Sequence, residues 1–321
     1  MKISIALATY NGGKYLQEQL DSFSKQSRVP DELVVCDDGS IDNTLDILRK
    51  FENQAPFTVR IFENPQNLGY VQNFAKAMSL CSGDIIFLSD QDDVWYPNKL
   101  DVVVRYFQSY PGCLLVANDS DLADENLLQS GLTISGQLRS SGVTDRQFVN
   151  GCGSAISKKF LDIMLPIPTM IPNAHDGWIH DLGYWLGCRK VIPDVLQLYR
   201  RHNSNTSQPL AASLSKVSWL DEYKKYQGID PREGYYKEIE KLKLISERIS
   251  LCKNLEMFQT ENFYFSEKVA EIQKIQAAIL RRCELLGCAR FVRPWFAVSN
   301  YLHGDYDYFQ GWKSLIKDIL R

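Results

Sequence analysis

The chain has no hydrophobic run long enough to cross a membrane. No stretch approaches the roughly 18 consecutive apolar residues that a membrane-spanning helix needs. The first apolar run, Ile3–Ala8, stops before Asn11-Gly12-Gly13, so it is too short for the apolar core of a secretion signal. We therefore expect this run to be a strand and the protein to be cytoplasmic.

An excess of basic residues is also missing. The 36 Lys and Arg face 39 Asp and Glu, which gives a net charge of −3. No nucleic-acid partner is expected, because phosphate neutralisation normally needs a basic excess or a basic face. The eight cysteines form no CxxC pair, and their scatter through apolar segments indicates buried free thiols in a reducing compartment.

What the chain does contain is enough sequence for one large domain and an appendage. Its 321 residues, 45% hydrophobic and 23% charged, have the composition of a globular protein. Strand and helix periods alternate in the first half, whereas long helical patterns follow, at Tyr235–Phe258 and Asn262–Leu286. We place the boundary near residue 210, which predicts domains 1–210 and 211–321.

The alternation in the first half predicts a doubly wound α/β fold. Helices are expected near Tyr15–Lys25, after Ser40 and over Gly69–Leu80, and strands at Ile3–Ala8, Glu32–Cys36, Thr58–Phe62 and Asp84–Ser89. Such βαβ units form a mostly parallel sheet flanked by helices. Ligands of these sheets bind beyond the carboxyl ends of the strands, so the residues that follow each strand are the candidates for a site.

The strongest chemical signal follows the fourth predicted strand. Asp90, Asp92 and Asp93 put three carboxylates within four positions, and like charges this close raise one another's pKa unless a cation neutralises them. A hard divalent ion such as Mg²⁺ or Mn²⁺, bound to a diphosphate, fits this cluster. The alternative is an acidic turn in which Asp93 caps a helix that begins near Pro97.

The second predicted strand also ends in carboxylates. In Asp37-Asp38-Gly39-Ser40, one aspartate can accept a hydrogen bond from a base or a ribose hydroxyl, and Gly39 permits the turn. An ordinary turn and helix cap explains the same residues equally well.

Asparagines near two other predicted strand ends offer amides to a nucleotide. Thr9-Tyr10-Asn11 follows the first strand, and Asn67 and Asn73 flank the start of a helix, where a simple cap is an equally good explanation. Neither GxGxxG nor GxxxxGK[ST] occurs, which weighs against a dehydrogenase or a kinase.

Two further residues are candidates for chemistry. Asp176 stands beside Trp178, and a carboxylate near an apolar wall has the raised pKa that suits a general base. The alternative role is a helix cap, and Asp181 is the less favoured base. His202 follows a predicted strand, where it is either a metal ligand or an ordinary loop histidine.

Together these residues resemble the inverting family 2 glycosyltransferases of GT-A fold, over about residues 1–207. The matching segments occur in the family's order: Ala8-Thr9-Tyr10-Asn11, Asp37-Asp38-Gly39-Ser40, Asp90-Gln91-Asp92 as the DxD motif, and His175-Asp176-Gly177-Trp178. The resemblance implies that the first two segments hold the nucleotide and that Asp90 and Asp92 bind the metal diphosphate. It also implies that Asp176 is the base and that His202 adds a metal contact.

The Ser89-Asp90-Gln91-Asp92-Asp93 form of the motif, with Asn67, Gly69 and Asn73, is similar to the bacterial rhamnosyltransferase-like branch. That similarity implies Mn²⁺ or Mg²⁺ and a donor such as dTDP-rhamnose, with a UDP-hexose as the alternative. It also implies a glycan or polyprenyl-lipid-linked acceptor in cell-wall or O-antigen polysaccharide synthesis.

Other interpretations of the chain stay open. A nucleotidyltransferase that makes NDP-sugars uses a related sheet, but its first loop would need several basic residues and here offers Lys14. A non-catalytic interaction module is the second alternative.

The helical region after residue 210 matches no motif. Arg281, Arg282, Arg290 and Arg293 lie near Phe291, Trp295 and Phe296, a mixture that suits a peripheral contact with the inner face of the cell membrane or a lipid-linked acceptor. Because apolar helix faces usually bury against protein, a bundle covering the sheet or a homodimer interface is slightly favoured.

Overall fold

The computed structural model describes residues 1–141, 146, 148–169, 175–203, 205, 210–218, 221, 229–255, 258 and 265–320. The chain divides into two compact units. Unit 1 comprises residues 1–139 and 144–216, and unit 2 comprises residues 140–143 and 217–321.

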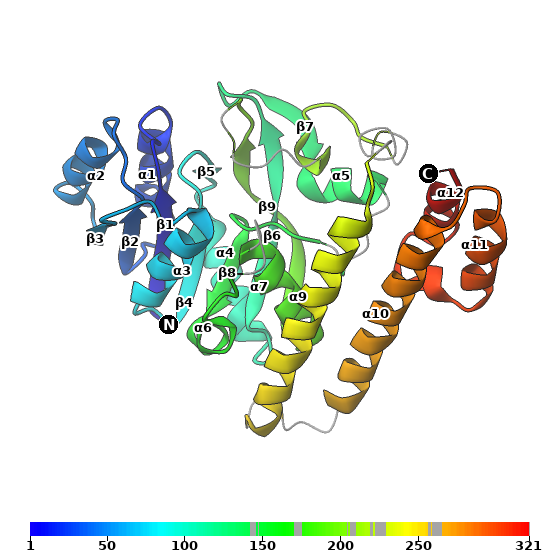
Figure 1. Cartoon of the computed structure of the whole chain (residues 1–321). Helices are drawn as coiled ribbons and strands as arrows, with labels where there is room; N and C mark the ends of the chain where they lie inside the picture. Colours follow the sequence, from blue (N-terminus) through cyan, green and yellow to red (C-terminus); the bar gives the residue numbers. More distant parts are fainter. Residues whose placement is uncertain are drawn as a thin grey trace. The chain divides into compact units, whose positions relative to one another are not determined.

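The first half of unit 1 alternates strands and helices (Figure 1). The elements are β1 (Ile3–Thr9), α1 (Leu16–Ser24), β2 (Glu32–Asp37), α2 (Thr44–Glu52), β3 (Thr58–Glu63), α3 (Tyr70–Leu80) and β4 (Ile85–Ser89). The four strands lie in the order β3-β2-β1-β4, all parallel. Strands β1, β2 and β4 are buried along their whole length, as expected of parallel strands covered on both faces. The predicted alternation and the α/β fold class are confirmed.

The second half of unit 1 extends the same sheet with mixed pairing. Strand β8 lies antiparallel to β4, and β6, β9 and β5 follow, with β7 paired to β6. The elements are β5 (Val94–Trp95), α4 (Lys99–Ser109), β6 (Leu115–Ala123), β7 (Gln129–Thr133), α5 (Ile134–Ser141), β8 (Ser154–Ser157), α6 (Lys158–Met164), α7 (His175–Trp185), β9 (Arg189–Arg200) and η2 (Leu210–Ala212). Strand β9 runs parallel to β6, so its carboxyl end joins those of β1, β2 and β4 at the ligand edge.

Unit 2 is helical. Its elements are α9 (Arg232–Leu251), η3 (Cys252–Asn254), α10 (Phe265–Gly287), α11 (Arg293–Leu302), η5 (Asp305–Tyr308) and α12 (Trp312–Leu320). The long helices α9 and α10 pack along each other, and α11 and α12 pack together beside α10 (Figure 1). Both long helices were predicted with slightly different ends, and part of the predicted ranges, residues 256–257 and 262–264, lies outside the described residues.

The prediction of free cysteines is confirmed. All eight cysteines are unpaired, and six of them are buried. Among the helices in the described part of the chain, none combines the length and apolar character that crossing a bilayer requires.

Candidate functional site

A cavity of about 780 Å³ opens in unit 1 beside the residues that follow β1, β2, β4 and β9. Of the residues predicted for the site, all but Gly39 line this cavity: Thr9, Tyr10, Asn11, Asp38, Asn67, Asn73, Asp90, Asp92, Asp176 and His202. Residues far apart in sequence therefore converge where parallel strands end. Ala211 and Ala212 of η2 also line the cavity, so the unit that holds the site continues past residue 210.

The loop after β1 is tied to the loop after β2. Asn11 has a positive φ of 48°, which asparagine adopts more readily than most residues. Its backbone N–H donates to Ser40 Oγ at 2.8 Å, and its side-chain Oδ1 accepts from the Ile41 N–H at 2.9 Å. Asn11 thereby fixes the backbone of both loops at the cavity wall.

The two aspartates after β2 have separate partners. Asp37 is fully buried and accepts hydrogen bonds from Thr9 Oγ1 (2.7 Å) and Ser40 Oγ (2.6 Å). Gly39, at φ 84°, lets the chain fold back over it. Asp37 therefore braces the loop from inside, and Asp38 is the carboxylate at the cavity.

Asp38 organises the segment before α3. Its carboxylate accepts from Asn64 Nδ2 (2.8 Å) and from the N–H groups of Leu68 (2.8 Å) and Gly69 (2.9 Å). Asn67 donates to the Asp38 carbonyl at 3.2 Å, and buried Asn73 donates to the Cys36 carbonyl at 2.8 Å. These bonds hold Asp38, Asn67 and Asn73 in one rigid wall.

The acidic turn after β4 sends its carboxylates to different surroundings. Asp93 is buried and accepts from Gln197 Nε2 (3.2 Å) and the Arg200 N–H (3.2 Å). Burial, together with the charge of Asp92, raises the pKa of Asp93 to about 7. The N-cap of α4 is Asn98, so Asp93 does not cap that helix. Asp90 and Asp92 line the cavity instead.

Asp90 is the least compensated carboxylate of the turn. Burial raises its pKa well above the usual range, and the charges of Asp92, Asp93 and Asp176 add to the effect. Lys99 is buried nearby and donates to the Cys152 carbonyl (3.1 Å) and to Gln197, but burial lowers its pKa to about 7. This lysine is therefore a weak counter-charge at neutral pH.

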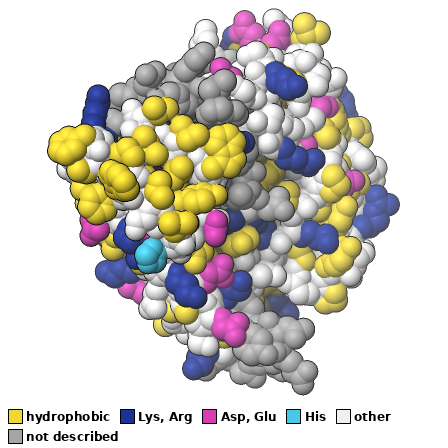
Figure 2. Space-filling view, turned by 90° about the vertical axis from the view of Figure 1, so that its right-hand side faces the viewer, with side chains coloured by type: hydrophobic (Ala, Val, Ile, Leu, Met, Phe, Trp, Pro, Cys, Tyr) yellow, Lys and Arg dark blue, Asp and Glu magenta, His cyan; other side chains and the backbone are white. Residues whose placement is uncertain are grey.

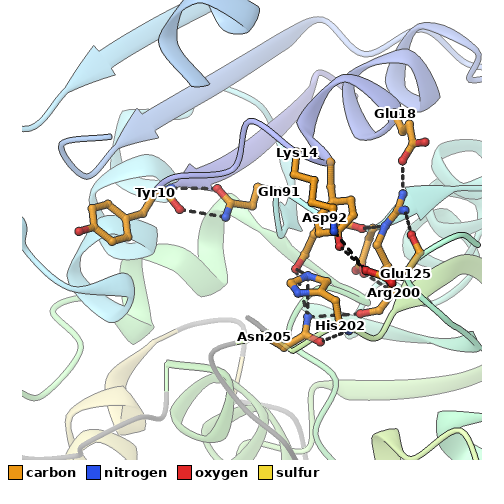
Figure 3. A network of polar contacts seen from close by, with 11 residues as sticks. Tyr10, Lys14, Glu18, Gln91, Asp92, Glu125, Arg200, His202 and Asn205 are labelled. Atoms are coloured by element: carbon orange, nitrogen blue, oxygen red, sulfur yellow. Dashed lines mark hydrogen bonds and ion pairs between the residues drawn. The ribbon is translucent and has the colours of Figure 1, made fainter. Parts of the chain in front are cut away.

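Asp92 is held by a network that begins at the end of β9 (Figure 3). His202 Nε2 lies 2.8 Å from Asp92 Oδ2, and Asn205 Nδ2 donates to the same oxygen at 3.1 Å. Arg200 donates from Nε to the Asp92 carbonyl (2.7 Å) and from Nη1 to the Glu125 carbonyl (2.6 Å), and it forms an ion pair with Glu18. Both the backbone and the carboxylate of Asp92 are thus fixed in place.

Asp176 faces the same cavity from α7. It lies in the first turn of that helix, next to buried His175, whose ring stacks on Phe74 at 4.5 Å. A Cβ at Gly151 would lie 3.0 Å from the Asp176 Cβ, so a glycine there leaves space for the carboxylate. Asp181 is buried in the same helix and is not among the lining residues.

The cavity is poor in cationic side chains. Among the described lining residues, Lys14 is the sole lysine and arginine is absent, whereas four carboxylates line the wall: Asp38, Asp90, Asp92 and Asp176. Lys14 Nζ is itself paired with Glu125 at 3.1 Å. A diphosphate would be repelled here unless a cation accompanied it.

The donor atoms present fit a hard divalent cation. In the described chain, ligand atoms of Asp90, Asp93 and Cys152 gather within 4.8 Å of one another. Cys152 offers a soft sulfur atom, whereas hard cations such as Mg²⁺ and Mn²⁺ prefer oxygen ligands. The carboxylates of Asp90 and Asp92, which also face the cavity, are the better oxygen ligands.

Several site residues carried no sequence signal. Gln91 exchanges two hydrogen bonds with the backbone of Tyr10, at 2.9 and 3.0 Å, and so joins the acidic turn to the loop after β1 (Figure 3). Its position between Asp90 and Asp92 was the one feature of the sequence that could have indicated a role for Gln91 in the site. Arg200, Asn205 and Cys152 come from distant segments whose spacing reveals nothing.

Comparison with known proteins finds glycosyltransferases among the relatives of this chain. Residues 4–159 match the sequence model of the family described as glycosyl transferase family 2, a segment that contains Asp90 and Asp92 and ends before Asp176. The chain is 28% identical over 292 residues to an uncharacterized glycosyltransferase of Nostoc sp., covering 87% of this chain and 88% of that protein. It is 27% identical over 257 residues to the dTDP-rhamnosyl transferase RfbG of Shigella flexneri, covering 74% and 83%.

Solved structures share the fold at low sequence identity. S. aureus TarS residues 1–349, in complex with UDP, has a TM-score of 0.56 and 16% identity, covering 99% of this chain and 89% of that one. The mannosyltransferase PcManGT of Pyrobaculum calidifontis, in complex with GDP-Man and Mn2+, has a TM-score of 0.51 and 14% identity, covering 94% and 74%. The fold is therefore GT-A, and the comparisons together support a glycosyltransferase of the family 2 type.

Proposed function

We propose that the protein transfers a sugar from a nucleotide-sugar donor to an acceptor hydroxyl with inversion at the anomeric carbon. The observation that carries this proposal is the convergence of Asp90, Asp92 and Asp176 on one cavity that is poor in cationic side chains. Two of these carboxylates would hold a metal diphosphate, and the third would receive a proton.

The nucleotide would lie along the wall formed by the loops after β1 and β2. We assign its contacts to Thr9, Tyr10, Asn11, Asp38, Asn67 and Asn73, with Asp90 beside the diphosphate. Gly39, which does not line the cavity, would contribute by permitting the turn behind Asp38. Asn11, Asp38 and Asn73 already bond through their side chains to backbone groups of Ile41, Leu68 and Cys36, so much of their contribution would be to keep the cavity wall in place.

The chemistry follows from the remaining side chains. Asp176 would accept the acceptor's hydroxyl proton as that oxygen attacks the anomeric carbon from the side opposite the leaving diphosphate. A divalent ion, Mn²⁺ or Mg²⁺, held by Asp90 and Asp92 would supply charge stabilisation to the leaving phosphate. His202 and Asn205 would orient Asp92, with His202 as a further ligand.

We favour dTDP-rhamnose as the donor. The support is the relative named a dTDP-rhamnosyl transferase, of which the chain covers 83%. A UDP-hexose is the alternative donor, and the acceptor we propose is a glycan or lipid-linked glycan of the bacterial cell surface. We further propose that residues 1 to about 210 form the catalytic domain and that the helical remainder makes acceptor, subunit or membrane contacts.

A hydrolysis assay tests this proposal. We would measure release of nucleoside diphosphate from a panel of dTDP-, UDP- and GDP-sugars, with Mn²⁺ or with EDTA. We expect turnover of one donor class, with Mn²⁺ present. Asp92→Ala should lose about 10²- to 10³-fold, whereas Asp101→Ala, which removes a carboxylate of α4 that pairs with Arg105, should not.

Three outcomes would contradict the proposal. Equal turnover in EDTA would show that the reaction needs no metal ion. Near-wild-type rates in Asp92→Ala would show that Asp92 is not a metal ligand. Formation of nucleotide sugar and pyrophosphate from a nucleoside triphosphate and a sugar phosphate would instead identify a nucleotidyltransferase.

A further inference from the structure

The last helices of unit 2 turn polar side chains inward. Asp318 has no exposed surface and accepts from Arg282 Nε at 2.7 Å and from Tyr306 Oη at 3.0 Å. Asp305, 2% exposed, accepts from Arg281 Nε at 2.6 Å. Ion pairs between α10, η5 and α12 thus occupy positions where an ordinary helical bundle places apolar residues.

Large apolar side chains of α11 and α12 face solvent beside these ion pairs. Helix α11 buries Ala297 and Asn300 but leaves Trp295 80% exposed. We define the terminal patch as the apolar residues after Arg290 that are more than half exposed: Phe291, Trp295, Phe296, Leu302, Trp312 and Leu320. Figure 2 shows hydrophobic side chains gathered on this face, with Lys, Arg and a few acidic side chains around them.

The charge around the terminal patch is opposite in sign to that of the whole chain. Residues 281–321 contain seven Lys and Arg and four Asp and Glu, whereas the whole chain has a net charge of −3. The two ion pairs take Arg281 and Arg282 together with Asp305 and Asp318, which leaves five basic and two acidic residues in this segment. Arg290 is exposed directly beside Phe291, so the patch presents a basic border.

These features discriminate between the surfaces that could cover the patch. A second copy docked by two-fold symmetry would bring the same positive borders together, which is unfavourable. An anionic bilayer matches both the apolar patch and its basic border. Tryptophan and phenylalanine bind at the lipid–water interface, and Lys and Arg attract acidic headgroups.

We infer that the terminal patch docks peripherally on an anionic lipid bilayer, with α11 and α12 lying at the headgroup level. The inference depends on unit 2 alone and holds whichever sugar donor unit 1 uses. It favours the membrane contact over the bundle or homodimer that the sequence slightly favoured.

Vesicle flotation of the full chain tests the inference. We would compare vesicles of phosphatidylcholine alone with vesicles containing about 30% phosphatidylglycerol. We expect the wild type to float with the anionic vesicles and to be released as salt approaches about 1 M, where charges are screened within about 3 Å. The double variant Trp295→Ser/Trp312→Ser should lose at least about tenfold in apparent affinity.

Two variants refine the test. Leu251→Ser removes a side chain of unit 2 that is 76% exposed at the end of α9, outside the patch, and should bind as the wild type does. Arg290→Glu should weaken binding to anionic vesicles and leave the melting temperature unchanged, because its side chain is exposed. Retained melting temperature in the double variant would show that its loss of binding is not unfolding.

Two results would overturn the inference. One is flotation that is absent, or that the double variant leaves unchanged. The other is a wild type that sediments as a dimer, dissociates on Trp295→Ser/Trp312→Ser and ignores vesicles. Because flotation is measured without any donor, its failure leaves the glycosyltransferase proposal intact, and failed hydrolysis leaves this inference intact.

Discussion

Asp318 in unit 2, which is fully buried, and Asp90 in unit 1, which is partly buried, have opposite surroundings. In unit 2, Asp318 is held by Arg282 and Tyr306, and this pairing raises the pKa of the arginine. In unit 1, Asp90 meets other carboxylates, and its pKa is raised instead of being held low. A matched buried charge supports the fold, whereas an unmatched one at a cavity marks the place where a ligand supplies the missing charge.

Unit 1 also contains a matched case. Glu32 accepts from Ser4 Oγ (2.5 Å), from the Ser82 N–H (2.6 Å) and from Arg60 (2.8 Å). Burial alone would raise its pKa, but these hydrogen bonds lower it to about 2. Carboxylates with matched partners therefore occur in both units, and the unmatched carboxylate lies at the cavity.

The largest effect is expected from Asp176→Asn. If Asp176 accepts the acceptor's proton, transfer should fall by about 10²- to 10⁴-fold while donor affinity stays within about twofold. Steady-state transfer rates and calorimetric donor titration separate the two quantities. Asp162→Asn, an exposed carboxylate of α6, is the control. A variant that loses donor binding and transfer together would place Asp176 outside the chemistry.

The next effect is on stability, in unit 2. Asp318→Asn leaves the Arg282 guanidinium buried without its anion and should cost about 3 to 5 kcal/mol. Thermal or urea unfolding measures this loss, and Arg282→Met/Asp318→Leu should recover most of it. Donor hydrolysis by the folded protein should be unchanged. A loss below about 1 kcal/mol would show that the pair is not matched as described.

Asp90→Asn should behave in the opposite way. Metal-dependent hydrolysis should fall about 10²- to 10³-fold, since the variant would hold the metal ion that stabilises the leaving phosphate less tightly. The melting temperature should stay equal or rise, because the substitution removes a poorly compensated charge. A fall in melting temperature as large as that of Asp318→Asn would show that Asp90 stabilises the fold as Asp318 does, which would contradict this comparison.

The smallest effect concerns acid stability through Glu32. Because its folded pKa of about 2 lies below the ordinary 4.5, its contribution is complete above about pH 4.5 and is lost as the pH falls toward 2. Glu32→Gln should cost about 1 to 3 kcal/mol at neutral pH and give a shallower fall in stability over that window. Parallel curves of unfolding free energy against pH would contradict the assignment.

The sequence was sufficient to predict the elements from β1 to β4, because hydrophobic period and strand-end residues are local signals. The residues that follow β1, β2 and β4 were also predicted to share one site, since carboxyl ends of parallel strands lie at one edge. Asp176 lies in the first turn of α7, and only the family resemblance linked it to that site. The mixed half of the sheet was harder to predict, because β8 pairs with β4 and no local sequence pattern specifies that pairing.

The supports of the site could not be predicted for a related reason. Arg200 reaches the Asp92 carbonyl across 108 residues of sequence, and no spacing rule connects them. In unit 2 the same limit applies to helix orientation. The apolar residues of α11 look like an inward face, but Trp295 is 80% exposed, and on α12 a fully buried position is taken by Asp318, which pairs with Arg282.

The most direct measurement is the position of Mn²⁺ in a crystal grown with the nucleoside diphosphate of the active donor, located by anomalous scattering. We expect the ion about 2.1 Å from carboxylate oxygens of Asp90 and Asp92 and in contact with the diphosphate. A diphosphate bound in the cavity with the ion far from both aspartates, or with no ion at all, would contradict the assignment of this site.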